Sequence, residues 1–212
     1  MYQYGNAWEE FPIEPGDVWG IPENGSRVAV HDIFDPLPDF MYSADVLVID
    51  PPWNQGNLNA FYTKAGRGDY QTWQNFSTRL FQCIGEISPP VCYIEIGNQF
   101  VGEWRTRLAT LYPSVQHWPV VYYNRNPTNI LRGSTTPVDY NFSGMDEARV
   151  IRLIGEIEEY CVMGDLCMGQ GLVGLSAYRA SRTFVGTELN KRRLANLLQK
   201  LARQGAHIIR YP

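Results

Sequence analysis

The sequence lacks a membrane-spanning segment, a cysteine cluster that could bind zinc and a generally basic composition. It has no run of about 18 consecutive apolar residues, which excludes a membrane-spanning helix. The first 20 residues carry no basic start and no apolar core, so we expect no secretory signal and a cytoplasmic protein. The 4 cysteines form no CxxC pair, and we therefore expect reduced thiols without a zinc cluster.

Charge is scarce as well. Acidic residues number 22 and basic residues 18, so any nucleic-acid-binding face has to be a local basic patch. Hydrophobic residues make up 44% of the chain, which supports a sizeable core and excludes disorder. A length of 212 residues suits one domain, and we expect residues 1–212 to form it, with residues 1–26 as an irregular arm.

Short apolar runs alternate with amphipathic segments along the chain, a pattern typical of an α/β fold with a mostly parallel sheet. The predicted strands are residues 27–32, 44–50, 91–97, 114–124, 129–133, 160–166, 183–188 and 206–211. The predicted helices are residues 71–87, 99–111, 146–159, 172–180 and 190–204. Two polar segments, residues 54–70 and the region 125–145 around the shortest strand, are predicted as loops on the substrate side.

A glycine-rich turn, DLCMGQG at residues 165–171, joins a predicted strand to a predicted helix. Gly169 and Gly171 allow a tight turn and close approach of a ligand to the backbone, and Glu188 at the end of the next strand suits ribose hydroxyls. Residues 169–174 also match GxGxxG, so a nicotinamide-dependent oxidoreductase and a turn without a ligand remain alternatives. Asp165 ahead of the glycines favours S-adenosylmethionine, whose ammonium group needs an acid or a carbonyl at the strand end.

A second motif, Asp50-Pro51-Pro52-Trp53, ends a buried strand. The prolines fix the backbone and remove two donors, so the cluster is rich in hydrogen-bond acceptors. Acceptors beside the flat face of Trp53 suit the planar amino group of a nucleic-acid base. A rigid loop that only ends the strand is the alternative.

Together the motifs resemble the S-adenosylmethionine-dependent amino-methyltransferases, which chiefly methylate N6 of adenine. Residues 50–53 match the [DNS]PP[YFW] motif, residues 165–173 resemble a DPFxGSGxT-like cofactor run, and VGTELN at residues 185–190 resembles an IGIELN-like strand end. Residues 31–53 are similar to the opening segment of the permuted beta class, in which the catalytic motif precedes the cofactor motif. Leu166, Cys167 and Gln170 depart from the family pattern.

The resemblance implies a Rossmann-like class I methyltransferase fold with helices on both faces of the sheet and a circularly permuted motif order. It implies methyl transfer from S-adenosylmethionine to N6 of adenine in DNA, with S-adenosylhomocysteine as product and no metal. The catalytic residues it implies are Asp50, Pro51, Pro52 and Trp53. The cofactor-binding residues it implies are Asp32, Asp50, Asp165, Cys167, Met168, Gly169, Gly171, Glu188, Asn190 and Phe142. Asp32 is expected at the cofactor's adenine and Phe142 at its methionine end.

Alternatives stay open on the substrate side. The same chemistry on RNA adenine or on cytosine N4 stays open, because the acceptors suit any exocyclic amino group, although in the family the Trp ending leans to adenine. An inactive methyltransferase-like subunit that binds nucleic acid is a further alternative, against which the intact Asp50, Gly169, Gly171 and Glu188 argue. No segment is long enough for a separate target-recognition domain, so we expect low specificity, a homodimer or a partner chain, as in phage-like methylases. Further candidates for substrate contact are residues 122–125, Lys64 and Arg67; residues 191–193 are more readily explained as a solvated helix face.

Overall fold

The computed structural model describes residues 5–122 and 125–212, and these form one nine-stranded sheet in the order β5-β6-β4-β3-β7-β8-β2-β1-β9. The strands are β1 (Val18–Ile21), β2 (Ser26–Val30), β3 (Val46–Ile49), β4 (Val91–Ile96), β5 (Ser114–Tyr122), β6 (Asn126–Ser134), β7 (Val162–Asp165), β8 (Thr183–Glu188) and β9 (Ile209–Tyr211). The strands predicted from the sequence are all present, with shifted ends.

Five strands at the centre of the sheet, β4, β3, β7, β8 and β2, pair in parallel. At one edge β6 and β5 pair antiparallel, and at the other edge β1 and β9 do. The predicted α/β class is therefore confirmed, with antiparallel edges on a parallel centre. Because the central strands run the same way, the segments that follow β3, β7, β8 and β2 all leave the sheet at the carboxyl ends of the strands, where α/β proteins bind ligands.

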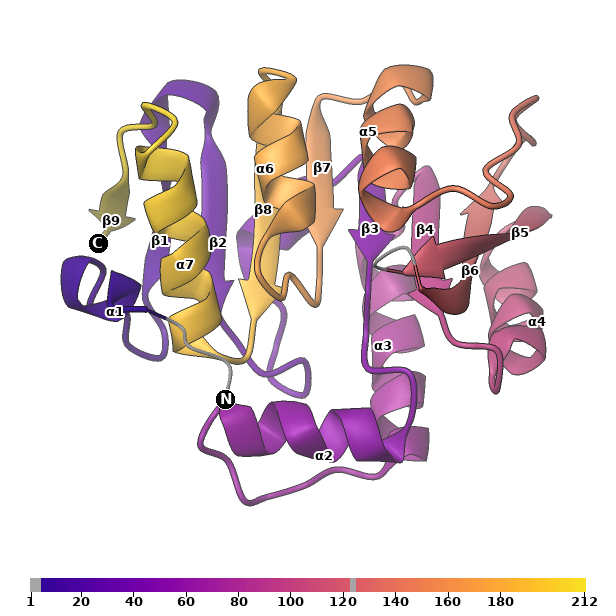
Figure 1. The fold of residues 1–212 in the computed structure, drawn as a ribbon, viewed down its shortest axis with the longest axis horizontal. Helices are drawn as coiled ribbons and strands as arrows, with labels where there is room; N and C mark the ends of the chain where they lie inside the picture. Colours follow the sequence, from indigo (N-terminus) through magenta and orange to yellow (C-terminus); the bar gives the residue numbers. More distant parts are fainter. Residues whose placement is uncertain (1–4, 123–124) are drawn as a thin grey trace.

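Helices cover both faces of the sheet (Figure 1). They are α1 (Ala7–Glu10), α2 (Gln55–Lys64), α3 (Trp73–Ile87), α4 (Val101–Leu111), α5 (Glu147–Ile157), α6 (Leu172–Arg179) and α7 (Lys191–Ala202), with short 3-10 turns at Pro22–Asn24 and Asp39–Ser43. One apolar core holds Ile154 of α5 and Leu198 of α7, and a second holds Leu80 of α3 and Trp104 of α4. Within the part of the chain that is described, no helix has the length and apolar character needed to cross a membrane.

The predicted N-terminal arm is wrong for most of residues 5–26. Helix α1 packs against α7, and β1 pairs with both β2 and β9. Phe11, Ile13 and Trp19 are buried in the first core, so the segment contributes apolar surface. Prolines and glycines between these side chains break the periodicity by which a strand or helix is predicted. Residues 1–4 of the predicted arm lie outside the described residues.

The predicted loop over residues 54–70 is also wrong, because its first part is helix α2. The side chain of Asn54 caps this helix by accepting the N–H of Asn57 at 2.9 Å. Leu58 and Tyr62, four residues apart, are its buried face. Only two of its ten residues are buried, so the apolar pattern is too weak to reveal a helix. Similarly, β6 occupies the first part of the predicted loop 125–145.

Helix α2 lies across the edge of the sheet at which the central parallel strands end (Figure 1). The amide of Asn190, at the start of α7, donates to the backbone oxygen of Lys64 at 2.8 Å. In the turn after α2, Arg67 forms an ion pair with Asp32 at 3.2 Å. These contacts join α2 to the ends of β2 and β8 and close one side of the cavity described next.

Candidate active site

A cavity of about 590 Å³ lies between α2 and the carboxyl ends of the central strands. This volume is within the usual range for small-molecule sites. Eight of the residues predicted for catalysis or cofactor binding line it: Asp32, Asp50, Pro52, Asp165, Cys167, Met168, Gly169 and Glu188. The structure therefore brings the two motifs, more than 100 positions apart in the sequence, to one site.

Asp50 lies directly after β3, and Pro51 prevents the strand from continuing. Its Oδ1 accepts the indole N–H of Trp53 at 3.0 Å. Burial raises the pKa of Asp50 to about 6, while hydrogen bonds from Trp53 and Tyr122 and the charge of Arg193 act in the opposite direction. Above that pKa, Asp50 is a fixed, ionised hydrogen-bond acceptor inside the cavity.

Trp53 itself does not line the cavity. Its ring packs against Gly97, where an added Cβ would lie 3.2 Å from Trp53 Cε3. It also meets the ring of Tyr122 edge to face, with the ring centroids 5.1 Å apart. In this structure Trp53 therefore orients the Asp50 carboxylate, a contact that the sequence analysis did not anticipate. Stacking of Trp53 on a base remains a prediction.

The glycine-rich turn after β7 is built around two buried acids. Glu188 accepts the N–H of Gly169 at 2.7 Å and the N–H of Asn190 at 2.9 Å. Asp165 accepts the N–H of Cys167 at 2.8 Å. Burial raises the pKa of Glu188, against the charge of Arg193 and the backbone hydrogen bonds. The carboxylates thus hold the turn in shape while they face the cavity.

Gly171 starts α6 with a positive φ of 78°, which favours glycine. A Cβ at this position would lie 2.4 Å from Cδ1 of Leu197, so α7 also requires the small residue. Gly171, Asn190 and Pro51 do not line the cavity. They support it instead: Gly171 shapes the turn, and Asn190 caps α7 and holds α2.

Phe142 is not where the resemblance placed it. It is fully buried, does not line the cavity, and packs edge to face against Tyr93 and Trp118 at centroid distances of 6.1 and 5.0 Å. Phe142 thus lies among core rings beside the antiparallel edge of the sheet. The resemblance implied a ligand contact because this region packs on the methionine end in permuted members; here the ring of Phe142 belongs to the core.

Asp32 follows β2 and lines the cavity at the side of α2. Its Oδ1 accepts the N–H of Phe34 at 3.1 Å, and its Oδ2 pairs with Arg67. The hydroxyl of Tyr62 approaches Oδ1 at 3.5 Å. A ligand that uses Asp32 therefore meets a carboxylate that α2 and the turn after it already contact.

The other candidates for substrate contact divide into two groups. Tyr122 and Lys64 line the cavity, whereas Arg125 is exposed; Tyr123 and Asn124 lie outside the described residues. Lys191 forms an ion pair with Glu14 at the surface, in agreement with a solvated helix face. Arg193 differs, because it lines the cavity with its guanidinium 4.5 Å from the ring centroid of Phe61. The sequence analysis had grouped Arg193 with its exposed neighbours.

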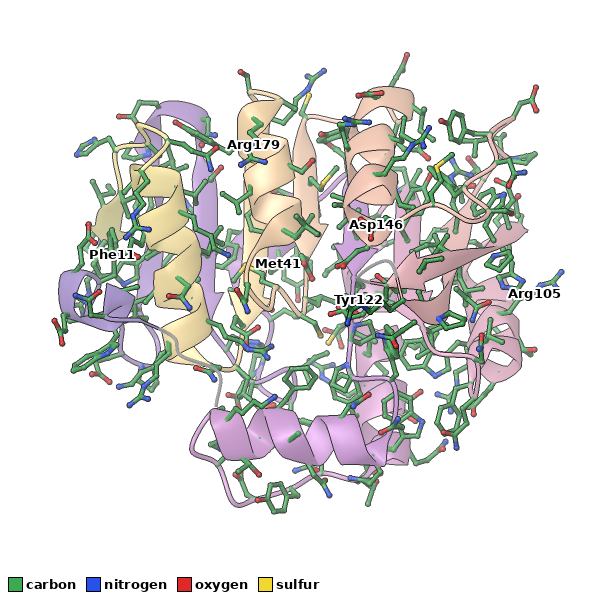
Figure 2. All side chains as sticks on the ribbon, viewed as in Figure 1. Phe11, Met41, Arg105, Tyr122, Asp146 and Arg179 are labelled. Carbon is green, nitrogen blue, oxygen red and sulfur yellow. The ribbon has the colours of Figure 1, made fainter. Side chains whose placement is uncertain are left out.

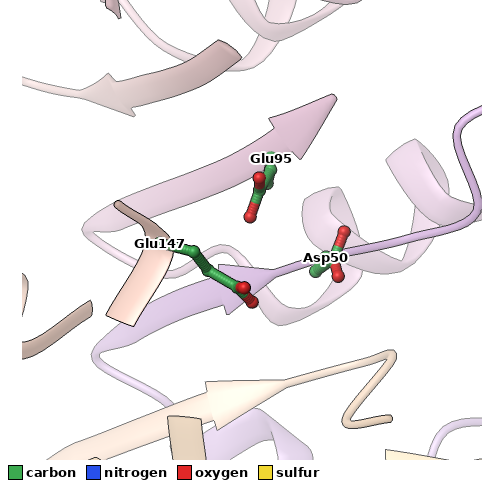
Figure 3. Close-up of side chains that lie close together, drawn as sticks. All are labelled: Asp50, Glu95 and Glu147. Carbon is green, nitrogen blue, oxygen red and sulfur yellow. The ribbon is translucent and has the colours of Figure 1, made fainter. Parts of the chain in front are cut away.

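The sequence analysis missed a cluster of three carboxyl groups, Asp50, Glu95 and Glu147, with one oxygen of each within 4.8 Å of the others (Figure 3). Burial first, and the charge of Asp50 second, raise the pKa of Glu95 to about 10 and that of Glu147 to about 8. Three such oxygens are a donor set of the kind that Mg²⁺ or Ca²⁺ takes. The expectation that no metal is needed stays a prediction.

Asp146 fixes the position of Glu147 in this cluster. The Asp146 side chain caps α5 by accepting the N–H of Ala148 at 3.1 Å. An isolated bridge joins Asp146 to Val121 at the end of β5. Figure 2 shows Asp146 and Tyr122 one above the other in this region. The first turn of α5 is thereby tied to the sheet, and Glu147 points into the cavity.

The raised pKa values predict that the protein loses stability as the pH rises. In the folded state Glu147 and Glu95 hold protons up to pH values of about 8 and about 10, whereas in the unfolded chain they release them near the ordinary pKa of 4.5. Between these limits the folded state binds more protons, so the free energy of unfolding falls with rising pH. We expect the melting temperature to fall from pH 6 toward pH 9 and to fall less in Glu95→Gln. A melting temperature that rises over this range would contradict the assignment.

No protein-family model matches the chain, and no curated protein does. Several solved structures do match the chain. M1.HpyAVI aligns with a TM-score of 0.56 at 16% identity, over 82% of this chain and 97% of that one. TTHA0409 of Thermus thermophilus, described as a proposed DNA modification methylase, aligns with a TM-score of 0.58 at 16% identity, over 84% and 95%. The cytosine-N4-specific PvuII DNA methyltransferase aligns with a TM-score of 0.53 at 12% identity, over 82% and 85%.

At these identities the similarity shows the fold, which is that of the DNA methyltransferases. M1.HpyAVI and TTHA0409 have also been crystallised with S-adenosylmethionine. The predicted methyltransferase-type α/β fold is therefore confirmed. The motif after β3 precedes the turn after β7 along this chain, although the two strands are neighbours in the sheet. That this order is a circular permutation stays a prediction.

Proposed function

We propose that this protein transfers a methyl group from S-adenosylmethionine to the exocyclic N6 amino group of adenine in DNA. The observation that carries the proposal is the shared cavity, in which Asp50 of the Asp-Pro-Pro-Trp motif faces the same space as the glycine turn and Glu188. The fold supports it, because the solved structures with this fold include DNA methyltransferases. A dinucleotide site would leave the motif at Asp50 without a role.

The residues present fit S-adenosylmethionine on charge. Carboxyl groups of Asp50, Asp165, Glu147 and Glu188 line the cavity, and burial raises the pKa of each. Buried carboxylates near one another are stabilised by a cationic ligand. S-adenosylmethionine carries a sulfonium and an ammonium group, so it supplies positive charge as well as an electrophilic methyl group. Glu188 and Asp32 would bind its ribose and adenine.

The chain's own part in the reaction centres on Asp50. Its carboxylate accepts hydrogen bonds from the target amino group, whereas Pro51, which was expected to supply a second acceptor, does not line the cavity. These bonds favour a pyramidal nitrogen whose lone pair is free for attack, and they stabilise positive charge that develops on it. The indole N–H of Trp53 and the hydroxyl of Tyr122 hold the carboxylate in place. Holding both reactants in one cavity supplies the orientation.

Cytosine N4 is the second candidate target, because the PvuII neighbour is described as cytosine-N4-specific and the acceptors at Asp50 suit any exocyclic amino group. RNA adenine remains an alternative on the same chemical ground. Target choice by short loops, a homodimer or a partner chain is part of the proposal.

The proposed function is tested by incubating the protein with S-adenosylmethionine labelled at the methyl group and with DNA or RNA. Nucleoside analysis of the product then identifies the base. We expect label in N6-methyladenine from DNA. Label in N4-methylcytosine, or in RNA alone, would redirect the substrate assignment. Tight binding of NAD without binding of S-adenosylmethionine would overturn the proposal.

We predict that Trp53→Phe lowers kcat by about tenfold or more, because a hydrogen bond to a charged group contributes roughly 1.5–3 kcal/mol. Phenylalanine keeps the ring against Gly97 but lacks the N–H that orients Asp50. Steady-state kinetics and the melting temperature, measured on the same sample, separate this effect from unfolding. Trp8→Phe, at a residue that is 47% exposed on α1, is the control. Wild-type kcat in Trp53→Phe would show that the N–H does not matter.

A further inference from the structure

Glu95 and Glu147 have no part in the methyl transfer as proposed, yet they point at the carboxylate that does (Figure 3). Glu95 is only 4% exposed, and its Oε1 has no hydrogen-bond partner within residues 5–122 and 125–212. A buried oxygen without a donor is destabilising unless a proton or a cation satisfies it. Because one oxygen of each of the three carboxyl groups lies within 4.8 Å of the others, binding of a positive charge between them is favourable.

Methylation of an amino group generates one proton. The lone pair of the amino nitrogen forms the new N–C bond, and the sulfur keeps the electron pair of the C–S bond that breaks. One N–H bond must then break, and its electron pair stays on the nitrogen, which ends as a neutral methylamino group. The sulfonium charge disappears in the same step. The charge beside Asp50 therefore falls by one unless the released proton stays there.

We propose that Asp50, Glu95 and Glu147 together accept this proton and keep it in the cavity until the methyl-depleted cofactor leaves, an inference that rests on the proposed function. Asp50 receives the proton directly, because it holds the amino group. Glu95 and Glu147 take part through their charge, because one carboxyl oxygen of each lies within 4.8 Å of one oxygen of Asp50. Since carboxyl groups bind a proton more tightly once a nearby positive charge is lost, the proton replaces the sulfonium charge.

The surroundings of the cluster favour proton binding over full ionisation. Glu95 faces Thr128 of β6, and both glutamates feel the charge of Asp146. Asp50 faces Trp53, Tyr122 and Arg193, and its charge also reaches Asp165 at the end of β7. The positive charge of Arg193 lowers the pKa of Asp50, whereas neighbouring acids raise the pKa values of Glu95 and Asp165. A change of one charge on the ligand therefore changes how strongly the carboxyl groups of this cluster bind a proton.

Isothermal titration of the whole protein in buffers of different ionisation enthalpy tests the proposal. The ligands are S-adenosylmethionine and S-adenosylhomocysteine, which differ in the methyl group and its positive charge. Near the Glu147 pKa of about 8, we expect S-adenosylmethionine to displace more protons than S-adenosylhomocysteine. The expected difference is about half a proton or more. In Glu95→Gln and in Glu147→Gln we expect it to shrink to less than about half of the wild-type value.

Glu156→Gln is the matched control, because Glu156 is an exposed residue of the same helix that pairs only weakly with Arg152. It is expected to keep the wild-type difference. Equal proton numbers for the two ligands, or an unchanged difference in both cluster variants, would overturn the inference while binding itself upholds the proposed function. Saturable binding of Mg²⁺ or Ca²⁺ that is lost in Glu147→Gln would assign the cluster to a metal and overturn it as well. No binding of S-adenosylmethionine would overturn the proposed function, and this inference with it.

Discussion

Asp50→Ala is expected to abolish methyl transfer while the Kd for S-adenosylmethionine stays within about tenfold of wild type, a change in binding free energy of at most about 1.4 kcal/mol. The variant removes the acceptor that holds the amino group and stabilises the charge on it, an effect that is large in a buried site. Under the proposed function, cofactor affinity is expected to depend mainly on the turn at residues 165–171 and on Glu188, which the substitution leaves intact.

Labelled-methyl transfer and isothermal titration on the same preparation check this prediction. Asp50→Asn is the finer variant, because it keeps the shape of the side chain and removes only its charge. Asp39→Ala, at an exposed position that does not line the cavity, is the control for handling and folding. Activity retained in Asp50→Ala would contradict the proposed mechanism. A cofactor Kd raised by far more than tenfold would move Asp50 from the target side to the cofactor side.

Glu188→Gln is expected to weaken cofactor binding by roughly 10–150-fold, the equivalent of about 1.5–3 kcal/mol for hydrogen bonds to a charged group. The variant removes the charge that is proposed to face the ribose. It also replaces one of the two oxygens that accept the N–H groups of Gly169 and Asn190. Both effects act in the same direction, because the glycine turn and the ribose contact belong to one binding surface.

The Kd for S-adenosylmethionine, measured by titration, decides the matter. The melting temperature is needed beside it, because the turn could loosen without any direct loss of ligand contacts. Glu103→Gln, an exposed glutamate of α4 that pairs with Arg107, is the control. An unchanged Kd in Glu188→Gln would place the ligand elsewhere in the cavity and would leave Gly169 and Gly171 without a ligand to approach.

The parts of the site that the sequence predicted are those whose signals are local. The apolar run at residues 44–49 followed by two prolines defines β3 and its end, so the place of Asp50 follows from chain order alone. The two glycines between a strand and a helix define the turn in the same way. Once the central strands are parallel, their carboxyl ends meet, and the two motifs meet with them.

The parts that the sequence did not predict depend on packing between distant segments. Trp53 donates to Asp50, and its ring lies in the space that Gly97 leaves on β4's carboxyl side, a contact between segments distant in the sequence. Phe142 was misplaced because its assignment followed from the position of its segment in the resembled family, whereas its packing depends on Tyr93 and Trp118 from distant strands. Helix α2 was missed because most of its residues are polar.

One signal was present and could have been used. Glu95 stands inside the otherwise apolar run Val91–Ile96, and a charged residue within a buried strand is rarely there for packing. Glu147 gave no comparable signal, since an acid in the first turn of a helix is accounted for by the helix dipole. The meeting of these two residues with Asp50 needs the fold.

The ion pair between Arg67 and Asp32 makes ligand binding a two-step equilibrium. In this structure the Asp32 carboxylate is engaged by Arg67 and approached by the hydroxyl of Tyr62. A ligand that needs the lone pair of Asp32 Oδ2 on which Arg67 acts binds only those molecules in which the pair is broken. Its apparent affinity is then the intrinsic affinity multiplied by the fraction of open molecules. Removing Arg67 would raise that fraction, so for such a ligand a side chain outside the cavity lining would set the concentration at which the cavity fills.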